Sequence, residues 1–121
     1  MALFECGGGS EAIIVESGKI IESGGNSQTG AFLKETSYTS GSSVSLTANR
    51  FNMSLIIGKC SSVNVSISAG VLNVAGVKNG VVTSLLAGTA LSYNGSVSNY
   101  DYIYVSAITD STFTPSLTIT D

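Results

Sequence analysis

The chain has 121 residues, of which 43% are hydrophobic and only 11% are charged, and its formal net charge is −3. This length suits one domain, and the scarcity of Glu and Lys argues against long solvent-exposed helices. Because the chain has no His and a net negative charge, it offers no basic surface to phosphates, so nucleic acid is not an expected partner.

The first ten residues, Met-Ala-Leu-Phe-Glu-Cys-Gly-Gly-Gly-Ser, differ in character from the rest of the chain. A run of three glycines predicts a flexible joint, and Leu3 and Phe4 before it are candidate interface residues on an N-terminal arm, with a disordered terminus as the alternative. We therefore expect an arm and joint at residues 1–10 and a single β domain at residues 11–121. This opening lacks the cationic start and apolar run of a secretory signal, so we expect cytoplasmic synthesis and no membrane partner.

Alternation of apolar and polar residues recurs along the chain after this opening. Val63, Val65 and Ile67, for example, alternate with polar side chains, which is the pattern of a strand with one buried face. Similar stretches lie at Ala12–Val15, Lys19–Glu22, Ala31–Glu35, Ser43–Asn49, Met53–Ile57, Val71–Val77, Val81–Ala87, Tyr100–Ile108 and Ser116–Thr120. About nine or ten short strands predict an all-β fold, an antiparallel β-sandwich or jelly-roll-like domain.

The dipeptide Asn79-Gly80 lies between two apolar runs and predicts a two-residue β-hairpin, because Asn and Gly tolerate positive φ angles. In that register Leu72 and Val74 share a face with Leu85 and Ala87. The first hairpin therefore predicts a coherent buried patch.

Asn94-Gly95 is a second candidate turn, but its register would place apolar residues opposite polar ones, so we do not expect a hairpin there. Longer loops are expected at Ser23–Gly30 and Ser40–Ser43, where polar residues and glycine dominate. The single proline, Pro115, suits the beginning of a last strand.

The sequence offers no recognisable set of catalytic residues. His is absent, and neither Cys6 nor Cys60 has a neighbouring base, so we expect two reduced, inert thiols and no catalytic residues. Whether the two cysteines are close enough to bond is left open by the sequence. Asp101 and Asp110 are candidate calcium ligands, but without the regular spacing of a calcium loop we expect no metal site and no cofactor.

The carboxylates of the first part of the chain, Glu16, Glu22 and Glu35 among them, lie near Lys19 and Lys34. Mixed charges of this kind are typical of a solvated face.

The segment Tyr100-Asp-Tyr-Ile-Tyr-Val holds three of the five tyrosines of the chain. A two-residue period would send Tyr100, Tyr102 and Tyr104 to one face of a strand, and Ile103 and Val105 to the other. Such a stripe is a candidate platform for a sugar or a protein interface. Cross-strand packing of aromatic rings, without any ligand, is the alternative.

The last third of the chain carries almost no charge beyond Lys78, whereas charged side chains commonly prevent unwanted pairing of sheet edges. We therefore expect a homo-oligomer or an assembly with partners. The Met1–Ser10 opening, the alternating Ser43–Asn49 segment and the ending Pro-Ser-Leu-Thr-Ile-Thr resemble small bacteriophage virion proteins, such as tail, head-fibre or decoration subunits. The resemblance implies a non-enzymatic structural or attachment component, with itself or other virion subunits as partners and the virion as its location.

Two other functions are open at this stage. A carbohydrate-binding or adhesin-like module would use the tyrosine stripe on a cell-surface glycan, although the absence of Trp argues against strong sugar stacking. A small hydrolase or isomerase is the least favoured, because no acid and base pair can be named.

Overall fold

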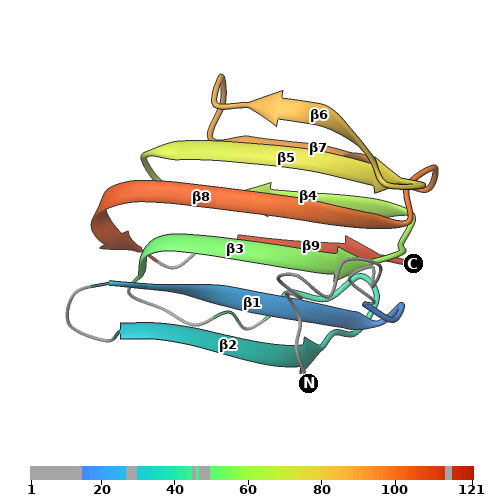
Figure 1. Cartoon of the computed structure of the whole chain (residues 1–121), viewed down its shortest axis with the longest axis horizontal. Coiled ribbons are helices and arrows are strands. Elements are labelled where there is room, and N and C mark those ends of the chain that lie inside the picture. Colours follow the sequence, from blue (N-terminus) through green and yellow to red (C-terminus); the bar gives the residue numbers. More distant parts are fainter. Residues whose placement is uncertain (1–14, 27–29, 45, 47–49, 114–115) are drawn as a thin grey trace.

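The computed structural model describes residues 15–26, 30–44, 46, 50–113 and 116–121. Nine antiparallel strands in this part of the chain form two sheets packed face to face (Figure 1). They are β1 (Lys19–Asn26), β2 (Gly30–Ser37), β3 (Arg50–Gly58), β4 (Ser62–Ser66), β5 (Val71–Lys78), β6 (Val81–Ala87), β7 (Ser92–Ser96), β8 (Tyr102–Phe113) and β9 (Ser116–Thr120). The all-β prediction is confirmed, and the arrangement is consistent with a β-sandwich.

The larger sheet has the order β2-β1-β3-β8-β5-β6, and the smaller has the order β7-β4-β9. From β3 onward the chain passes between the sheets at every connection except the β5–β6 hairpin. The two sheets are therefore tied together by the chain as well as by their core.

The core lies between the two sheets and follows from the period-two pattern. Leu55 of β3 is opposite Val105 of β8, which in turn is opposite Val74 of β5, and all three are almost completely buried. The smaller sheet contributes Val63, Val65, Leu117 and Ile119 to the same cluster. Burial of each such side chain stabilises the fold by roughly 1.5–3 kcal/mol, which explains why this face admits so few polar groups.

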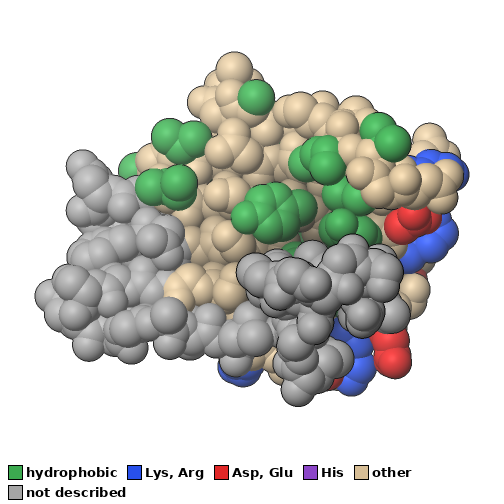
Figure 2. Space-filling model, in the orientation of Figure 1, with side chains coloured by type: hydrophobic (Ala, Val, Ile, Leu, Met, Phe, Trp, Pro, Cys, Tyr) green, Lys and Arg blue, Asp and Glu red, His purple; other side chains and the backbone are tan. Residues whose placement is uncertain are grey.

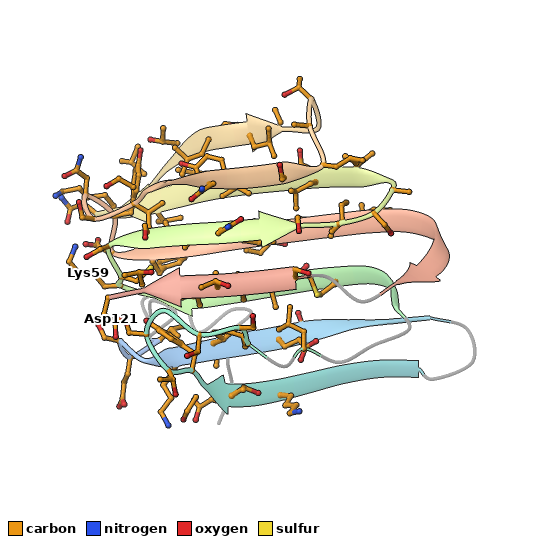
Figure 3. All side chains as sticks on the ribbon, turned by 180° about the vertical axis from the view of Figure 1, so that it is seen from behind. Lys59 and Asp121 are labelled. Atoms are coloured by element: carbon orange, nitrogen blue, oxygen red, sulfur yellow. The ribbon has the colours of Figure 1, made fainter. Side chains whose placement is uncertain are left out.

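The outward face of the smaller sheet is polar but uncharged (Figure 3). Its side chains form three cross-strand rows, and each of the three strands contributes one residue to every row. The rows are Ser96, Ser62 and Thr120; Asn94, Asn64 and Thr118; and Ser92, Ser66 and Ser116. Hydroxyls and amides thus take the solvent-facing positions that charged residues occupy in most sheets, which accounts for much of the low charge content.

The β5–β6 hairpin turns at Asn79-Gly80 as predicted, with φ angles of 51° and 78°. Beyond Ser84 the predicted register is wrong, because a β-bulge inserts one residue into β6 and places Leu86, rather than Leu85, opposite Val74. Both leucines still pack against the core. A bulge cannot be seen in the alternation pattern, since it leaves the apolar character of the strand unchanged.

The structure differs from the sequence prediction at three further places. The loop expected at Ser23–Gly30 is wrong, because β1 continues to Asn26 and β2 begins at Gly30. Asn94-Gly95 indeed makes no turn, but it lies inside β7, a strand that the sequence did not predict. Glu22 was expected on a solvated face, but it is only 1% exposed, because it shares the inward face of β1 with Ile20.

Of the segment expected as a strand at Ser43–Asn49, the structure describes Ser43, Val44 and Leu46, and among these Ser43 forms an isolated bridge with Thr118. Val44 and Leu46 are partly buried against the core without belonging to a strand. The loop expected at Ser40–Ser43 is confirmed for residues 40–42, which lie outside the strands. The expected arm at residues 1–10 and most of the strand expected at Ala12–Val15 lie outside the described residues.

Candidate functional site

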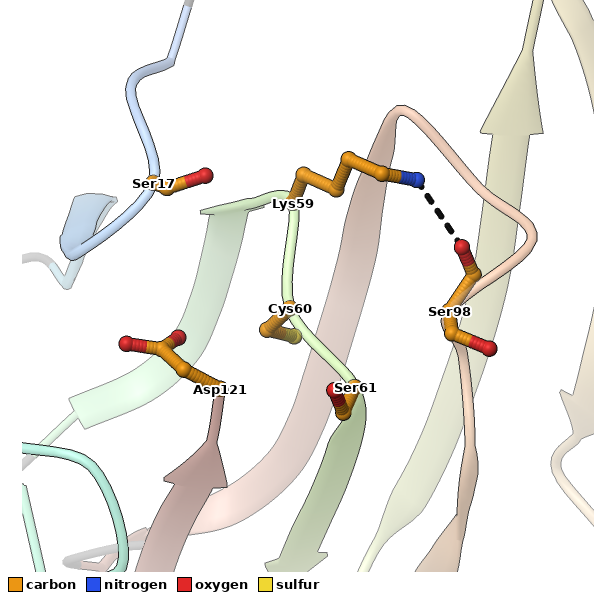
Figure 4. A pocket seen from close by; sticks show the side chains of 6 residues that line it. All are labelled: Ser17, Lys59, Cys60, Ser61, Ser98 and Asp121. Carbon is orange, nitrogen blue, oxygen red and sulfur yellow. Dashed lines mark hydrogen bonds between the residues drawn. The ribbon is translucent and has the colours of Figure 1, made fainter.

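A pocket of about 360 Å³ lies at the end of the sandwich where β3 leads into β4. Lys59 and Asp121 mark this end in Figure 3. The lining side chains, drawn in Figure 4, come from four separate parts of the chain: Ser17, Lys59, Cys60, Ser61, Ser98 and Asp121. They include a cation, a thiol and a carboxylate, so the pocket is the first place to look for chemistry.

The cation of this pocket is engaged by the protein itself. Lys59 Nζ donates hydrogen bonds to the carbonyl oxygens of Ser98, at 2.8 Å, and Tyr100, at 3.1 Å. Figure 4 shows its side chain extended toward Ser98. Lys59 therefore ties the β3–β4 connection to the β7–β8 connection and stabilises the end of the sandwich.

The thiol of Cys60 is free and only 6% exposed. Burial raises its pKa to about 11, the negative charge of Asp121 contributes to the increase, and Lys59 partly offsets both effects. The thiol is thus protonated at neutral pH and is a poor nucleophile. This agrees with the inert thiol expected from the sequence, whereas Cys6 lies outside the described residues.

Asp121 also makes contacts within the protein. The hydroxyl of Tyr38 donates to Asp121 Oδ1 at 2.5 Å, and the backbone N–H of Asp121 donates to Ser40 Oγ at 2.9 Å. Partial burial, together with the hydrogen bond to this carboxylate, raises the pKa of Tyr38 above its ordinary value. The cation and the carboxylate of the pocket are therefore each engaged in hydrogen bonds within the protein, which is a structural role.

The side chain of Asp101, a candidate calcium ligand, is engaged in a hydrogen bond with the backbone. Its Oδ2 accepts a hydrogen bond from the backbone N–H of Asn79 at 2.8 Å, which supports the turn between β5 and β6. In the part of the chain that the structure describes, no group of three or more His, Cys, Asp or Glu side chains is placed to hold a metal ion. The side chain of Asp110 is not among those described.

The tyrosine stripe contains two residues rather than three. Tyr102 and Tyr104 lie on the outward face of β8, where Tyr104 is 37% exposed and its hydroxyl is 3.2 Å from Ser54 Oγ. The expected place of Tyr100 is wrong, because β8 begins only at Tyr102. The ring of Tyr100 lies against Gly76 on the core side, in the space that a Cβ at that position would occupy.

The remaining tyrosines of the stripe belong to a broader apolar surface on the larger sheet. Val71 of β5 and Ile108 of β8 are opposite each other and are 45% and 54% exposed. Figure 2 shows hydrophobic side chains spread over β5, β6 and β8 on this face. An exposed apolar surface on a sheet is typical of a contact with another protein.

The β6 edge of the larger sheet adjoins that surface. Val81 and Val82 of β6 are 65% and 67% exposed, and β6 contains no charged residue. The last strand of the smaller sheet on the same side, β7, is also uncharged (Figure 1). We call the outer borders of β6 and β7 the open edges.

The opposite borders of the two sheets carry protection of two kinds. The segment Gly41–Val44 covers β9, with the N–H of Gly41 donating to Ile119 O and that of Val44 to Leu117 O, both at 2.8 Å. At the border of the larger sheet, β2 carries exposed Lys34 and Glu35. We call the borders at β2 and β9 the protected edges.

The sequence anticipated unprotected edges after position 79 but did not identify β6 as the border strand, because strand order is not encoded in alternation. The candidates Leu3 and Phe4 lie outside the described residues. No helix in the described ranges has the length and apolarity required to cross a membrane. The chain matches no protein-family model, no curated protein and no solved structure.

Proposed function

We propose that this chain is a non-enzymatic structural or attachment subunit that works through contacts between β domains. The open edge at β6 carries the proposal: an uncharged border strand with two valines about two-thirds exposed. Borders of this kind pair readily with another strand unless charge or a covering segment prevents it. Among the described residues, both kinds of protection are present on the opposite side of the sandwich and neither is present on β6.

The kind of assembly is proposed from the sequence resemblance to small bacteriophage virion proteins. Such subunits are made in the cytoplasm and act in the virion, with copies of themselves or other virion subunits as partners. The pocket at Lys59 and Asp121 supports a non-enzymatic role, since its cation and carboxylate are engaged in internal hydrogen bonds and its thiol is protonated.

A carbohydrate-binding or adhesin-like function is the second candidate. Its support is the outward face of β8, where Tyr104 is 37% exposed beside the partly buried Tyr102. Two rings, one of them partly covered, offer less stacking area than the three that the sequence predicted. We therefore favour a protein partner over a cell-surface glycan for this face.

Light scattering over a concentration series tests the proposal. The mean mass of the wild-type protein is expected to rise with concentration from the monomer mass of 12.3 kDa to at least that of a dimer. Val82→Lys places a charge on the open edge and is expected to remain monomeric. Thr89→Lys is the matched control, because it adds the same charge at an exposed residue in the connection after β6, and it should associate as wild type does.

Both substitutions affect exposed side chains, so each should change the free energy of unfolding by no more than about 0.5 kcal/mol. A wild-type chain that stays monomeric at every concentration, alone and with candidate partner subunits, contradicts the proposed function. Specific binding of an oligosaccharide by such a monomer would favour the second candidate instead.

A further inference from the structure

The β5–β6 hairpin determines which backbone groups of β6 face the open edge. In a two-residue hairpin the flanking residues, here Lys78 and Val81, are hydrogen-bonded to each other, and bonded and non-bonded pairs then alternate along the ladder. Val77 and Val82 are therefore a non-bonded pair. A hydrogen bond of Val77 supports this assignment. Its carbonyl oxygen accepts from Asp101 N at 2.7 Å, on the side away from β6.

The same alternation makes Gly76 and Thr83 a bonded pair, and Ala75 and Ser84 a non-bonded pair. The N–H and C=O groups of Val82 and Ser84 consequently point away from β5, toward the border where the sheet ends. Two residues spaced by two positions, each with an outward donor and an outward acceptor, form the template that an added antiparallel strand requires.

We propose that this template is filled by β6 of a second copy of the chain, antiparallel and related by a twofold axis at Thr83. The pairing rests on the proposed function and specifies its contact. Val82 of one subunit exchanges two backbone hydrogen bonds with Ser84 of the partner subunit, and Ser84 does so with the partner's Val82. The two six-stranded sheets then join into one continuous sheet.

Several observations favour a second copy as the occupant. A twofold contact uses the same surface on both subunits, and an antiparallel edge satisfies that condition in its own register. In this register the two Thr83 residues face each other between the two Val82–Ser84 pairs, and all of these residues lie in the regular part of β6. The only charged residue of the hairpin strands, Lys78, lies on β5 rather than on the border strand, so it stays out of the contact.

The β-bulge at the end of β6 sets the extent of the contact. The ladder to β5 is regular from Val81 to Ser84 and shifts beyond it, and a bulge turns the strand and interrupts pairing. The paired segment is therefore short and centred on Thr83. This length predicts association that depends on protein concentration rather than an inseparable dimer.

Cysteine cross-linking tests the register. At the twofold axis two Thr83 residues face each other as a non-bonded pair, with Cα atoms about 4.5 Å apart, within the range a disulfide spans. Thr83→Cys should therefore form a covalent dimer under mild oxidation. In the control Val81→Cys, the two cysteines are four positions out of register, or about 13 Å apart along the strands, and should not bond.

Both variants are made with Cys6→Ser, and that background alone serves as the blank. Cys60 can stay, because it is buried and its pKa is raised to about 11. We expect at least a ten-fold higher yield of covalent dimer for Thr83→Cys than for Val81→Cys. Equal yields from a protein that associates overturn the β6 pairing while leaving the proposed function intact, whereas a wild-type chain that never associates removes both.

A second pair of variants does not depend on new thiols. Val82→Pro removes the outward N–H but leaves the ladder to β5 intact, since proline is tolerated where a border N–H faces solvent. It should weaken association at least ten-fold, while Val82→Thr, which keeps the N–H, should associate as wild type does. Association of Val82→Pro at the wild-type concentration would also overturn the pairing.

Discussion

The border strands on the two sides of this sandwich differ in how they are protected from pairing with another strand. On one side, Gly41–Val44 covers β9 through two backbone hydrogen bonds, and β2 carries exposed Lys34 and Glu35. On the other side, β6 and β7 have neither charge nor a covering segment among the described residues. Because the described residues provide two kinds of protection on one side and none on the other, the contrast supports the proposal that the open side becomes covered on assembly.

The contrast also separates two uses of polar chemistry. Near the protected edge at β9, the side chains of Tyr38 and Asp121 form a hydrogen bond that ties the segment after β2 to the residue after β9. Near the open edge at β6, the outward groups are backbone amides and carbonyls of Val82 and Ser84, which another strand can satisfy. The charged pocket is thus structural, and the uncharged border is the candidate site.

High pH should weaken the protected side most, and this is the largest effect we expect. Burial raises the pKa of Cys60 from 9.0 to about 11, so its contribution to stability is present below pH 9 and is lost as pH rises through 11. A two-unit difference corresponds to a loss of about 2–3 kcal/mol in the free energy of unfolding. Denaturant melts between pH 8 and pH 11 measure it.

Cys60→Ala is the control, because it removes the titrating thiol. Its stability should fall less steeply over the same pH range, and the remaining slope is expected from Tyr38, whose pKa is also raised. An identical slope in both proteins would contradict the role assigned to the buried thiol.

Uncovering β9 should convert a protected edge into an open one. Val44→Pro removes the N–H that donates to Leu117 O and leaves that carbonyl without its partner, at a cost of about 2 kcal/mol. Association should increase at the same time. Val44→Ile, which keeps the N–H and the apolar side chain, is the matched control for both the melt and the mass measurement.

The turn that presents β6 is held by backbone conformation. Gly80 has a φ of 78° and a Cβ there would meet no atom within 4 Å, so Gly80→Ala should cost about 1 kcal/mol through backbone strain alone. Gly80→Asn should cost less, because Asn tolerates this region. Equal melting curves for Gly80→Ala and wild type would show that the hairpin does not depend on this turn.

The smallest effect is expected at Tyr104. Tyr104→Ser on the outward face of β8 should change the free energy of unfolding of the monomer by no more than about 0.5 kcal/mol, since the residue is 37% exposed. If the apolar face beside β6 adds to the contact, the same variant should associate less tightly. A loss of monomer stability as large as that of a core substitution would assign the ring to the core.

The sequence predicted the fold class and most strands because burial on one face imposes a period of two on each strand. It predicted the Asn79-Gly80 turn because few residues accept that backbone. It missed β7, whose Ser92–Ser96 segment contains a single large apolar residue and no alternation of charge or hydropathy. The β6 bulge and the inward Glu22 were missed for a related reason, since both depend on partners that lie in other strands.

The candidate site was predicted only in outline. Low charge after Lys78 indicated uncharged border strands, which β6 and β7 are, but not that Gly41–Val44 covers the border of β9. Nothing local distinguishes a border strand such as β6 from an internal strand such as β5. Tyr100 was placed wrongly because the two-residue period was extended past the first residue of β8, into a turn where the ring packs on Gly76. Strand order and strand ends are properties of the whole sheet, which explains both errors.

Hydrogen exchange of the β6 amides tests the central claim most directly. The N–H groups of Val82 and Ser84 face the open edge, whereas those of Val81 and Thr83 face β5 and serve as internal controls. We predict that Val82 and Ser84 exchange rapidly in dilute protein and become protected as the protein associates, while Val81 and Thr83 are protected throughout. Rapid exchange of Val82 and Ser84 in a fully associated sample would contradict the β6 pairing, because the contact would then lie elsewhere.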